Sequence, residues 1–212
     1  MQIKWAEIDE VSDKPGVYAW YYTPKLSNKD INDSIRLIES AVLKNDLKEA
    51  KNAIVELLKD SIFSRFQETS YEVHLKGRLK ANYQGHVEHI PTISQSLINR
   101  IIESPSTLWS IREILLSAAP NFSSPLYIGM SDTLGTRLRS HKALIERYRT
   151  KIDGDLLGDF EEIEKDHSFA KEVVIRQLHS ELLFVCIEQI DDHFVDIENI
   201  LNRINFPLFG RN

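Results

Sequence analysis

The chain has 212 residues, of which 42% are hydrophobic and 27% charged, and its formal net charge is −6 at pH 7. This length and composition predict a globular protein with a sizeable core, built as one domain or as one domain with a large insertion, and the acidic balance argues against a surface that coats nucleic acid throughout. No apolar run approaches the ~18 residues of a bilayer span, no signal peptide is evident, and the single cysteine, Cys186, excludes an intrachain disulfide, so we expect a cytoplasmic protein that does not contact membranes.

The first half of the chain begins with one strand and continues with helices. Residues 16–22, GVYAWYY, are aromatic and β-branched and lie between two prolines, which predicts a strand. Residues 30–43 and 46–66 repeat apolar side chains with helical periodicity, so we expect an antiparallel helical hairpin. Residues 69–91 fit a strand, a hairpin or a loop, and two more helices are expected within 94–119.

The second half alternates strands and helices. Residues 124–149, SPLYIGMSDTLGTRLRSHKALIERYR, run from an apolar strand through a tight turn into a helix. An acidic connection at 154–166 and a short helix within 168–179 come before LLFVCIEQI at 182–190. That run is almost continuously apolar, which predicts a buried central strand. A final helix is expected within 193–206 and ends before Pro207.

Charge is distributed unevenly along this second half. Residues 126–151 carry six basic and two acidic side chains, whereas residues 152–197 carry thirteen acidic and three basic ones. One interpretation is two solvated faces that differ in charge. The other is a helix that binds a polyanion on an otherwise acidic protein.

The helix after YIG directs two polar side chains toward the core. A helix turns about 100° per residue, and the apolar stripe so defined consists of Leu134, Leu138, Ile145 and Tyr148. His141 falls in the middle of this stripe and Arg137 at its edge, while Arg139 points toward water. An arginine paired with an acidic neighbour and a hydrogen-bonded core histidine would explain the pattern structurally, because a buried unpaired charge is costly. A functional site on this face is the alternative.

The last helix shows a similar feature. Its predicted buried stripe consists of Phe194, Ile197, Leu201 and Ile204. Glu198 lies at the edge of this stripe, where a carboxylate either forms a salt bridge or binds a hard divalent cation.

Several landmarks then occur in a recognisable order. They are GVY at residues 16–18, YIG at residues 127–129, Arg137, His141, Glu198 and the tail NFPLFGRN, which ends in Asn212. In order and spacing they resemble the GIY-YIG nuclease family. The resemblance covers roughly half of the chain and implies an α+β fold with a small three-stranded antiparallel sheet flanked by helices.

The chain departs from the family pattern in two respects. The first motif reads GVY instead of GIY, and Tyr18 and Tyr127 are 109 positions apart, although the two motifs normally follow each other closely as a hairpin. We therefore expect residues 1–24 and 121–212 to form the nuclease core. Residues 25–120 would be a large, mainly helical insertion that supplies specificity, partner or homodimer contacts.

The resemblance assigns a role to each unusual residue. Tyr18 would act as general base or orient the attacking water, and Tyr127 would line the same site; which of the two is the base stays open. A phenol has a pKa near 10, so nearby positive charge would have to favour the phenolate. Arg137 would clamp the phosphate through its planar guanidinium, and His141 would bond to the tyrosine or the phosphate.

The remaining landmarks concern metal and DNA. Glu198 would hold one Mg²⁺ or Mn²⁺ ion, whose bound water protonates the leaving 3′-oxygen, and Asn212 would orient or lock the site. The basic helix suggests DNA contacts by Arg139, Lys142, Arg147 and Arg149. Three histidines of the insertion, His74, His86 and His89, do not make a convincing zinc set without a cysteine partner.

The sequence therefore predicts a metal-dependent DNA endonuclease, with restriction or anti-phage defence as the expected role by analogy. The alternative is a nucleic-acid-binding or protein-interaction module on the same scaffold that does not cleave.

Overall fold

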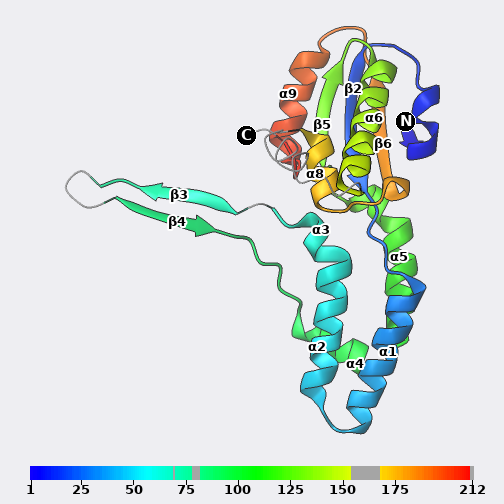
Figure 1. Ribbon diagram of the computed structural model, residues 1–212, viewed down its shortest axis with the longest axis vertical. Helices are drawn as coiled ribbons and strands as arrows, with labels where there is room; N and C mark the ends of the chain where they lie inside the picture. The colour runs from blue at the N-terminus through cyan, green and yellow to red at the C-terminus, as the bar shows by residue number, and fades with distance from the viewer. Residues whose placement is uncertain (69, 78–81, 154–167, 211–212) are drawn as a thin grey trace. The chain divides into compact units, whose positions relative to one another are not determined.

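The computed structural model describes residues 1–68, 70–77, 82–153 and 168–210, which form two compact units (Figure 1). One unit consists of Met1–Thr23 and Leu116–Asn212, and the other consists of Pro24–Leu115. These breaks lie close to the boundaries expected for a core with an insertion. The acidic connection at 154–166 and Asn212 lie outside the described residues.

The first unit is built on a four-stranded antiparallel sheet rather than the expected three-stranded one. Its strands are β1 (Gln2–Lys4), β2 (Gly16–Tyr22), β5 (Tyr127–Ser131) and β6 (Leu183–Gln189), in the order β1-β6-β2-β5. The additional strand β1 pairs with β6, and the Met1 ammonium donates to the Ile187 carbonyl at 2.8 Å. Three residues are too short to show a strand period in sequence, so this edge strand was missed.

Two of the predicted strands form the centre of this sheet. β6 lies between β1 and β2, and its apolar residues are buried, as expected for residues 182–190. β2 pairs with both β5 and β6, so the GVY and YIG segments are neighbours although a whole unit separates them in sequence. Gly16 permits the close approach to β6, because a Cβ there would lie 2.1 Å from the Glu188 carbonyl oxygen.

Helices cover the sheet. α6 (Leu134–Asp153) contacts β2 and β5, the short helix α8 (Phe169–Ile175) and the 3₁₀ helix η1 (Trp5–Glu10), and a 3₁₀ turn, η3 (Ser180–Leu182), leads into β6. The predicted stripe of α6 is confirmed, since Leu134, Leu138, Ile145 and Tyr148 are all buried together with His141. No described helix is long and apolar enough to cross a membrane.

The terminal helix α9 (Phe194–Asn205) packs beside β5 and β2 (Figure 1), but its predicted stripe is less covered than expected: Phe194, Ile197 and Leu201 are half-buried. None of its residues is buried, and Ile204 is 66% exposed. Periodicity identifies the apolar side of a helix, but it does not say whether another element covers that side.

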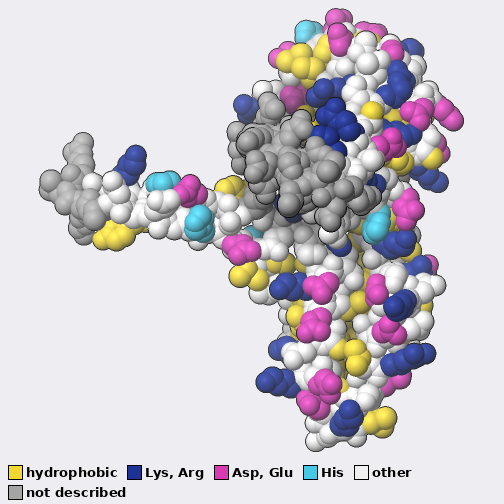
Figure 2. Space-filling model, in the orientation of Figure 1, with side chains coloured by type: hydrophobic (Ala, Val, Ile, Leu, Met, Phe, Trp, Pro, Cys, Tyr) yellow, Lys and Arg dark blue, Asp and Glu magenta, His cyan; other side chains and the backbone are white. Residues whose placement is uncertain are grey.

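The second unit is a helical body with one hairpin. Its elements are α1 (Asn28–Leu43), α2 (Leu47–Leu58), the π-helical turn η2 (Lys59–Phe63), α3 (Ser64–Phe66), β3 (Tyr71–Leu75), β4 (Tyr83–Val87), α4 (Gln95–Glu103) and the part of α5 (Thr107–Phe122) up to Leu115. Ser27, Asp46 and Ser94 cap the first turns of α1, α2 and α4, because the side chain of each accepts a hydrogen bond from the backbone N–H three residues later. On the face shown in Figure 2, acidic and basic side chains are interspersed over the α1–α2 pair.

Candidate active site

The centre of the candidate site is Tyr18, in the middle of β2. It pairs with Gly129 of β5 on one side and with Ile187 of β6 on the other, and only 2% of the residue is exposed. Trp20 is two residues after Tyr18 on the same strand, so the two side chains share a face of the sheet. Trp20 pairs with Tyr127, and because directly opposed residues also share a face, Tyr127 lies on the same face as Tyr18. Their ring centroids are 6.1 Å apart.

The glycine of YIG is what makes room for both tyrosines. A Cβ at Gly129 would lie 2.6 Å from the Tyr18 hydroxyl and 2.9 Å from a ring carbon of Tyr127. Such distances are well inside van der Waals contact, so any side chain here would displace at least one ring. The motif glycine is therefore required by the packing of the two motif tyrosines.

Two side chains of α6 meet the Tyr18 hydroxyl. His141 Nε2 lies 2.8 Å from it, and Arg137 Nε donates to it at 3.3 Å. A guanidinium can only donate, so the Tyr18 oxygen accepts from Arg137. If His141 is neutral with its proton on Nδ1, its Nε2 accepts the Tyr18 proton.

The electrostatics of the site keep both Tyr18 and His141 uncharged near neutral pH. Burial, with a smaller contribution from the Arg137 charge, lowers the pKa of His141 to about 3, so the imidazole is neutral at pH 7. Burial and the neighbouring Tyr127 raise the pKa of Tyr18 well above its ordinary value, although Arg137 opposes this. Arg137 thus acts on the pKa of Tyr18 in the expected direction, toward phenolate, but in the free protein desolvation outweighs the nearby guanidinium.

Aromatic side chains enclose the buried part of the site. Phe169 of α8 lies with its ring centroid 5.5 Å from Tyr127, 5.6 Å from His141 and 5.2 Å from Trp20. From the C-terminal tail, Phe209 reaches Phe169 at 6.2 Å, and its backbone N–H donates to the Leu126 carbonyl at the start of β5. This enclosure keeps water from the inner side of Tyr18 and His141.

Arg137 connects the enclosed site with solvent. The residue as a whole is exposed, while its Nε reaches the buried Tyr18 hydroxyl. Its hydrogen bond to Tyr18 raises the pKa of Arg137, so the guanidinium remains charged. An anion that approaches from outside would therefore meet a cation already tied to Tyr18.

Glu198 belongs to a separate hydrogen-bonded pair. It is half-buried on α9 and accepts from Asn202 Nδ2 at 2.7 Å. The structure thus joins Tyr18, Tyr127, Arg137 and His141 in one cluster, whereas Glu198 is on a different helix that packs on the same strands, β5 and β2.

The single carboxylate on α9, Glu198, could bind an ion such as Mg²⁺ only together with water and substrate oxygens. Among the described residues, no three His, Cys, Asp or Glu side chains come together as ligands. Mg²⁺ usually keeps several waters and takes one or two carboxylates together with substrate phosphate. The single carboxylate of Glu198 suits that type of site and not an ion held entirely by protein.

Three of the four cations expected to contact DNA hold the fold together. Arg139 donates to Asp13 Oδ2 at 3.0 Å and to the Val11 carbonyl at 3.1 Å. Lys142 pairs with Asp9. These acidic partners are more than a hundred positions away in sequence, so helix phasing had no means of finding them.

The other two predicted contacts differ from each other. Arg149 donates to the Leu178 carbonyl and the Ser180 hydroxyl, and so links α6 to the segment before β6. Arg147 is exposed and lies over the Tyr148 ring at 5.4 Å. Of the four, Arg147 is therefore the one whose position in the fold suits an external phosphate.

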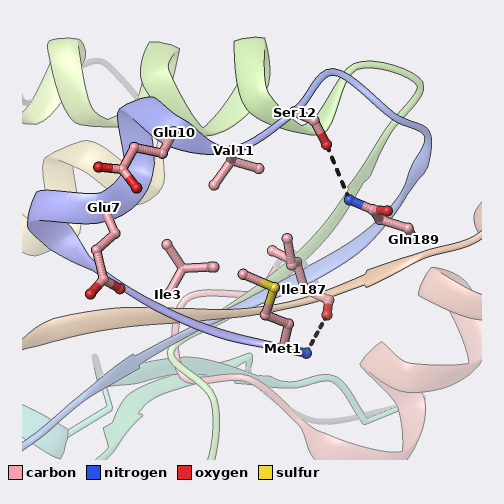
Figure 3. Close-up of a pocket in the computed structure, with 8 residues that line it drawn as sticks. All are labelled: Met1, Ile3, Glu7, Glu10, Val11, Ser12, Ile187 and Gln189. Carbon is pink, nitrogen blue, oxygen red and sulfur yellow. Dashed lines mark hydrogen bonds between the residues drawn. The ribbon is translucent and has the colours of Figure 1, made fainter.

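A cavity of about 360 Å³ lies between η1 and the β1–β6 edge of the sheet (Figure 3). Its lining residues are Met1, Ile3, Glu7, Glu10, Val11, Ser12, Ile187 and Gln189. It shares none of them with the Tyr18 cluster. Two glutamates and no Lys or Arg line it, so it does not suit a phosphate group.

Comparison with known proteins adds no further assignment: no protein-family model, curated protein or solved structure matches the chain. The function is therefore inferred from the site itself.

Proposed function

We propose that this protein is a metal-dependent DNA endonuclease of the GIY-YIG type. The observation that supports this most is the Tyr18 hydroxyl held between His141 Nε2 and Arg137 Nε, with Tyr127 beside it. A structural ion pair would place a carboxylate beside Arg137. The described contacts of Arg137 are with phenols instead, which leaves its charge available to an external anion.

Arg137 has the clearest role in this proposal. Phosphodiester hydrolysis needs positive charge at the phosphoryl oxygens, and a guanidinium matches their geometry. Because Arg137 is exposed and also bonded to Tyr18, the bound phosphate would lie within reach of the phenol. Binding the phosphate and orienting the tyrosine are then done by the same side chain.

Tyr18 and His141 form a path for one proton. The attacking water gives its proton to the Tyr18 oxygen while Tyr18 gives its own proton to His141 Nε2, so the phenolate with its unfavourable pKa is never fully formed. Arg137 is one of the two causes of the low pKa of His141. A phosphate on Arg137 offsets that charge, and the imidazole becomes a better proton acceptor when substrate is present.

Glu198 is the residue that would hold Mg²⁺ or Mn²⁺ together with substrate oxygens. When bound, such an ion neutralises charge on the phosphoryl oxygens and supplies an acidic water to the leaving 3′-oxygen. Asn202 orients the Glu198 carboxylate through their 2.7 Å hydrogen bond. Restriction or anti-phage defence is the biological role that the resemblance suggests.

The test is cleavage by the purified protein. Plasmid, single-stranded DNA and RNA are each incubated with Mg²⁺, Mn²⁺ or EDTA, beside the Arg137→Ala variant. We expect metal-dependent cuts in DNA that leave 5′-phosphate and 3′-hydroxyl ends and disappear in the variant.

Two results would count against the proposal. DNA left intact at high enzyme concentration with either metal, although bound, would favour the binding module without cleavage. Cleavage that survives in Arg137→Ala would point to a contaminating nuclease or to a different site.

A further inference from the structure

The hairpin β3–β4 has two faces of opposite character. Its register pairs Tyr71 with Val87, Val73 with Gly85 and Leu75 with Tyr83, and the pairs between them are Glu72 with His86 and His74 with Gln84. Because side chains alternate along a strand, the first three pairs share one face and the other two share the opposite face. We call these the apolar face and the polar face.

Glu72, His74 and Gln84 of the polar face interact with one another. Gln84 donates to Glu72 across the strands, and His74 Nε2 lies 3.5 Å from Glu72 Oε1. This face therefore needs only water around it.

The apolar face is uncovered. Tyr71, Leu75, Tyr83 and Val87 are 49–62% exposed, and every residue of β4 is exposed. Figure 2 shows hydrophobic and histidine side chains at the surface of this hairpin. A two-stranded hairpin on its own is at best marginally stable in water, so a face of this composition is expected to be buried against something.

Gly85 gives the apolar face its shape. A Cβ built on Gly85 meets nothing within 4 Å, and the backbone there needs no conformation special to glycine. The absent side chain leaves a notch opposite Val73, between the pairs formed by Tyr71 and by Tyr83. Such a notch beside large side chains allows a second face of the same kind to interlock with it.

We propose that the apolar face is the contact by which two copies of this chain associate. A two-fold contact brings the face against itself, and it carries no charged group, so no like charges oppose each other. The apolar face has five partly exposed apolar side chains, which are Tyr71, Val73, Leu75, Tyr83 and Val87. At about 100 Å² each, they would bury roughly 1,000 Å² over two copies, which is the lower bound for a specific interface. The expected complex is thus a reversible dimer with a Kd on the order of micromolar.

A nucleic acid fits this face poorly. Binding to DNA uses cations and hydrogen-bonding groups directed at phosphates and base edges, and apart from the two tyrosine hydroxyls the apolar face has neither. The inference does not depend on nuclease activity, since association is measured without substrate.

The first experiment is sedimentation equilibrium of the full chain up to roughly 100 µM, well above a micromolar Kd. The double variant Leu75→Ser/Tyr83→Ser is compared with the matched polar-face variant His74→Ser/Gln84→Ser. We expect a dimer for the wild type and the polar-face variant, and at least about a tenfold weaker association for the apolar-face variant. All four side chains are exposed, so circular dichroism should show unchanged folding.

The second experiment identifies the face directly. Gly85→Cys and Gln84→Cys are each made in a Cys186→Ser background and oxidised. An intermolecular disulfide is expected for Gly85→Cys and not for Gln84→Cys. A monomeric wild type, equal association of both double variants, or equal cross-linking at the two positions would each overturn the proposal.

Discussion

Replacing His141 with glutamine is expected to reverse the relative stability of variant and wild type between neutral and acidic pH. Glutamine offers Oε1 in place of Nε2, so the Tyr18 hydroxyl keeps an acceptor. Unlike histidine, it does not gain a proton when the protein unfolds in acid. The substitution therefore removes one titration and keeps one hydrogen bond.

The direction follows from proton linkage. His141 is 7% exposed, and its pKa falls from 6.5 to about 3 in the folded protein. The unfolded chain binds the proton near its ordinary pKa while the folded protein does not. The neutral histidine therefore contributes its full stability above pH 6.5, and this contribution is lost as the pH falls toward about 3.

The magnitude is large enough to measure. Each pH unit between the two pKa values is worth about 1.4 kcal/mol, so roughly 2–3 kcal/mol is lost about two units below the unfolded pKa. At neutral pH, an imperfect hydrogen bond in the variant costs about 1 kcal/mol. His141→Gln should thus be slightly less stable than the wild type near pH 7 and more stable near pH 4.5.

Urea unfolding at a series of pH values measures this difference. Carboxylate titrations are common to both proteins and cancel. The control is His179→Gln, because His179 is exposed whereas His141 is buried. Parallel curves for wild type and His141→Gln across this pH range would refute a buried, neutral His141.

Three further outcomes follow from the same contacts. Gly129→Ala should lower the free energy of unfolding by about 1–3 kcal/mol, because the added methyl group overpacks against the Tyr18 ring, and it should reduce cleavage. An unchanged free energy of unfolding would show that the rings of Tyr18 and Tyr127 leave space for the methyl group. Arg137→Ala should reduce single-turnover cleavage at least about a hundredfold and leave the thermal midpoint near normal. Arg139→Ala should lower the thermal midpoint, because it removes the partner of Asp13, and should leave the chemical step intact. Equal effects of the two variants on the chemical step would contradict the different positions of the two arginines. Glu198→Gln should keep folding and DNA affinity but reduce metal-dependent cleavage about a hundredfold, and cleavage at the normal rate would remove Glu198 as the metal ligand.

Local periodicity by itself was enough to place several parts of the candidate site. The spacing on α6 put His141 inside an apolar stripe and Arg137 at its edge, and the structure confirms both positions through their bonds to Tyr18. The apolar run at 182–190 predicted the central strand β6 in the same way. These predictions succeed because helix and strand periods are set by the backbone within a few residues.

Only the tertiary structure decided which distant groups meet. It paired Arg139 with Asp13, added β1 to the sheet, and left Ile204 uncovered on α9. It also showed that burial outweighs positive charge at Tyr18. Each of these depends on contacts between segments far apart in the chain, and desolvation is a property of the assembled surroundings that no residue spacing encodes.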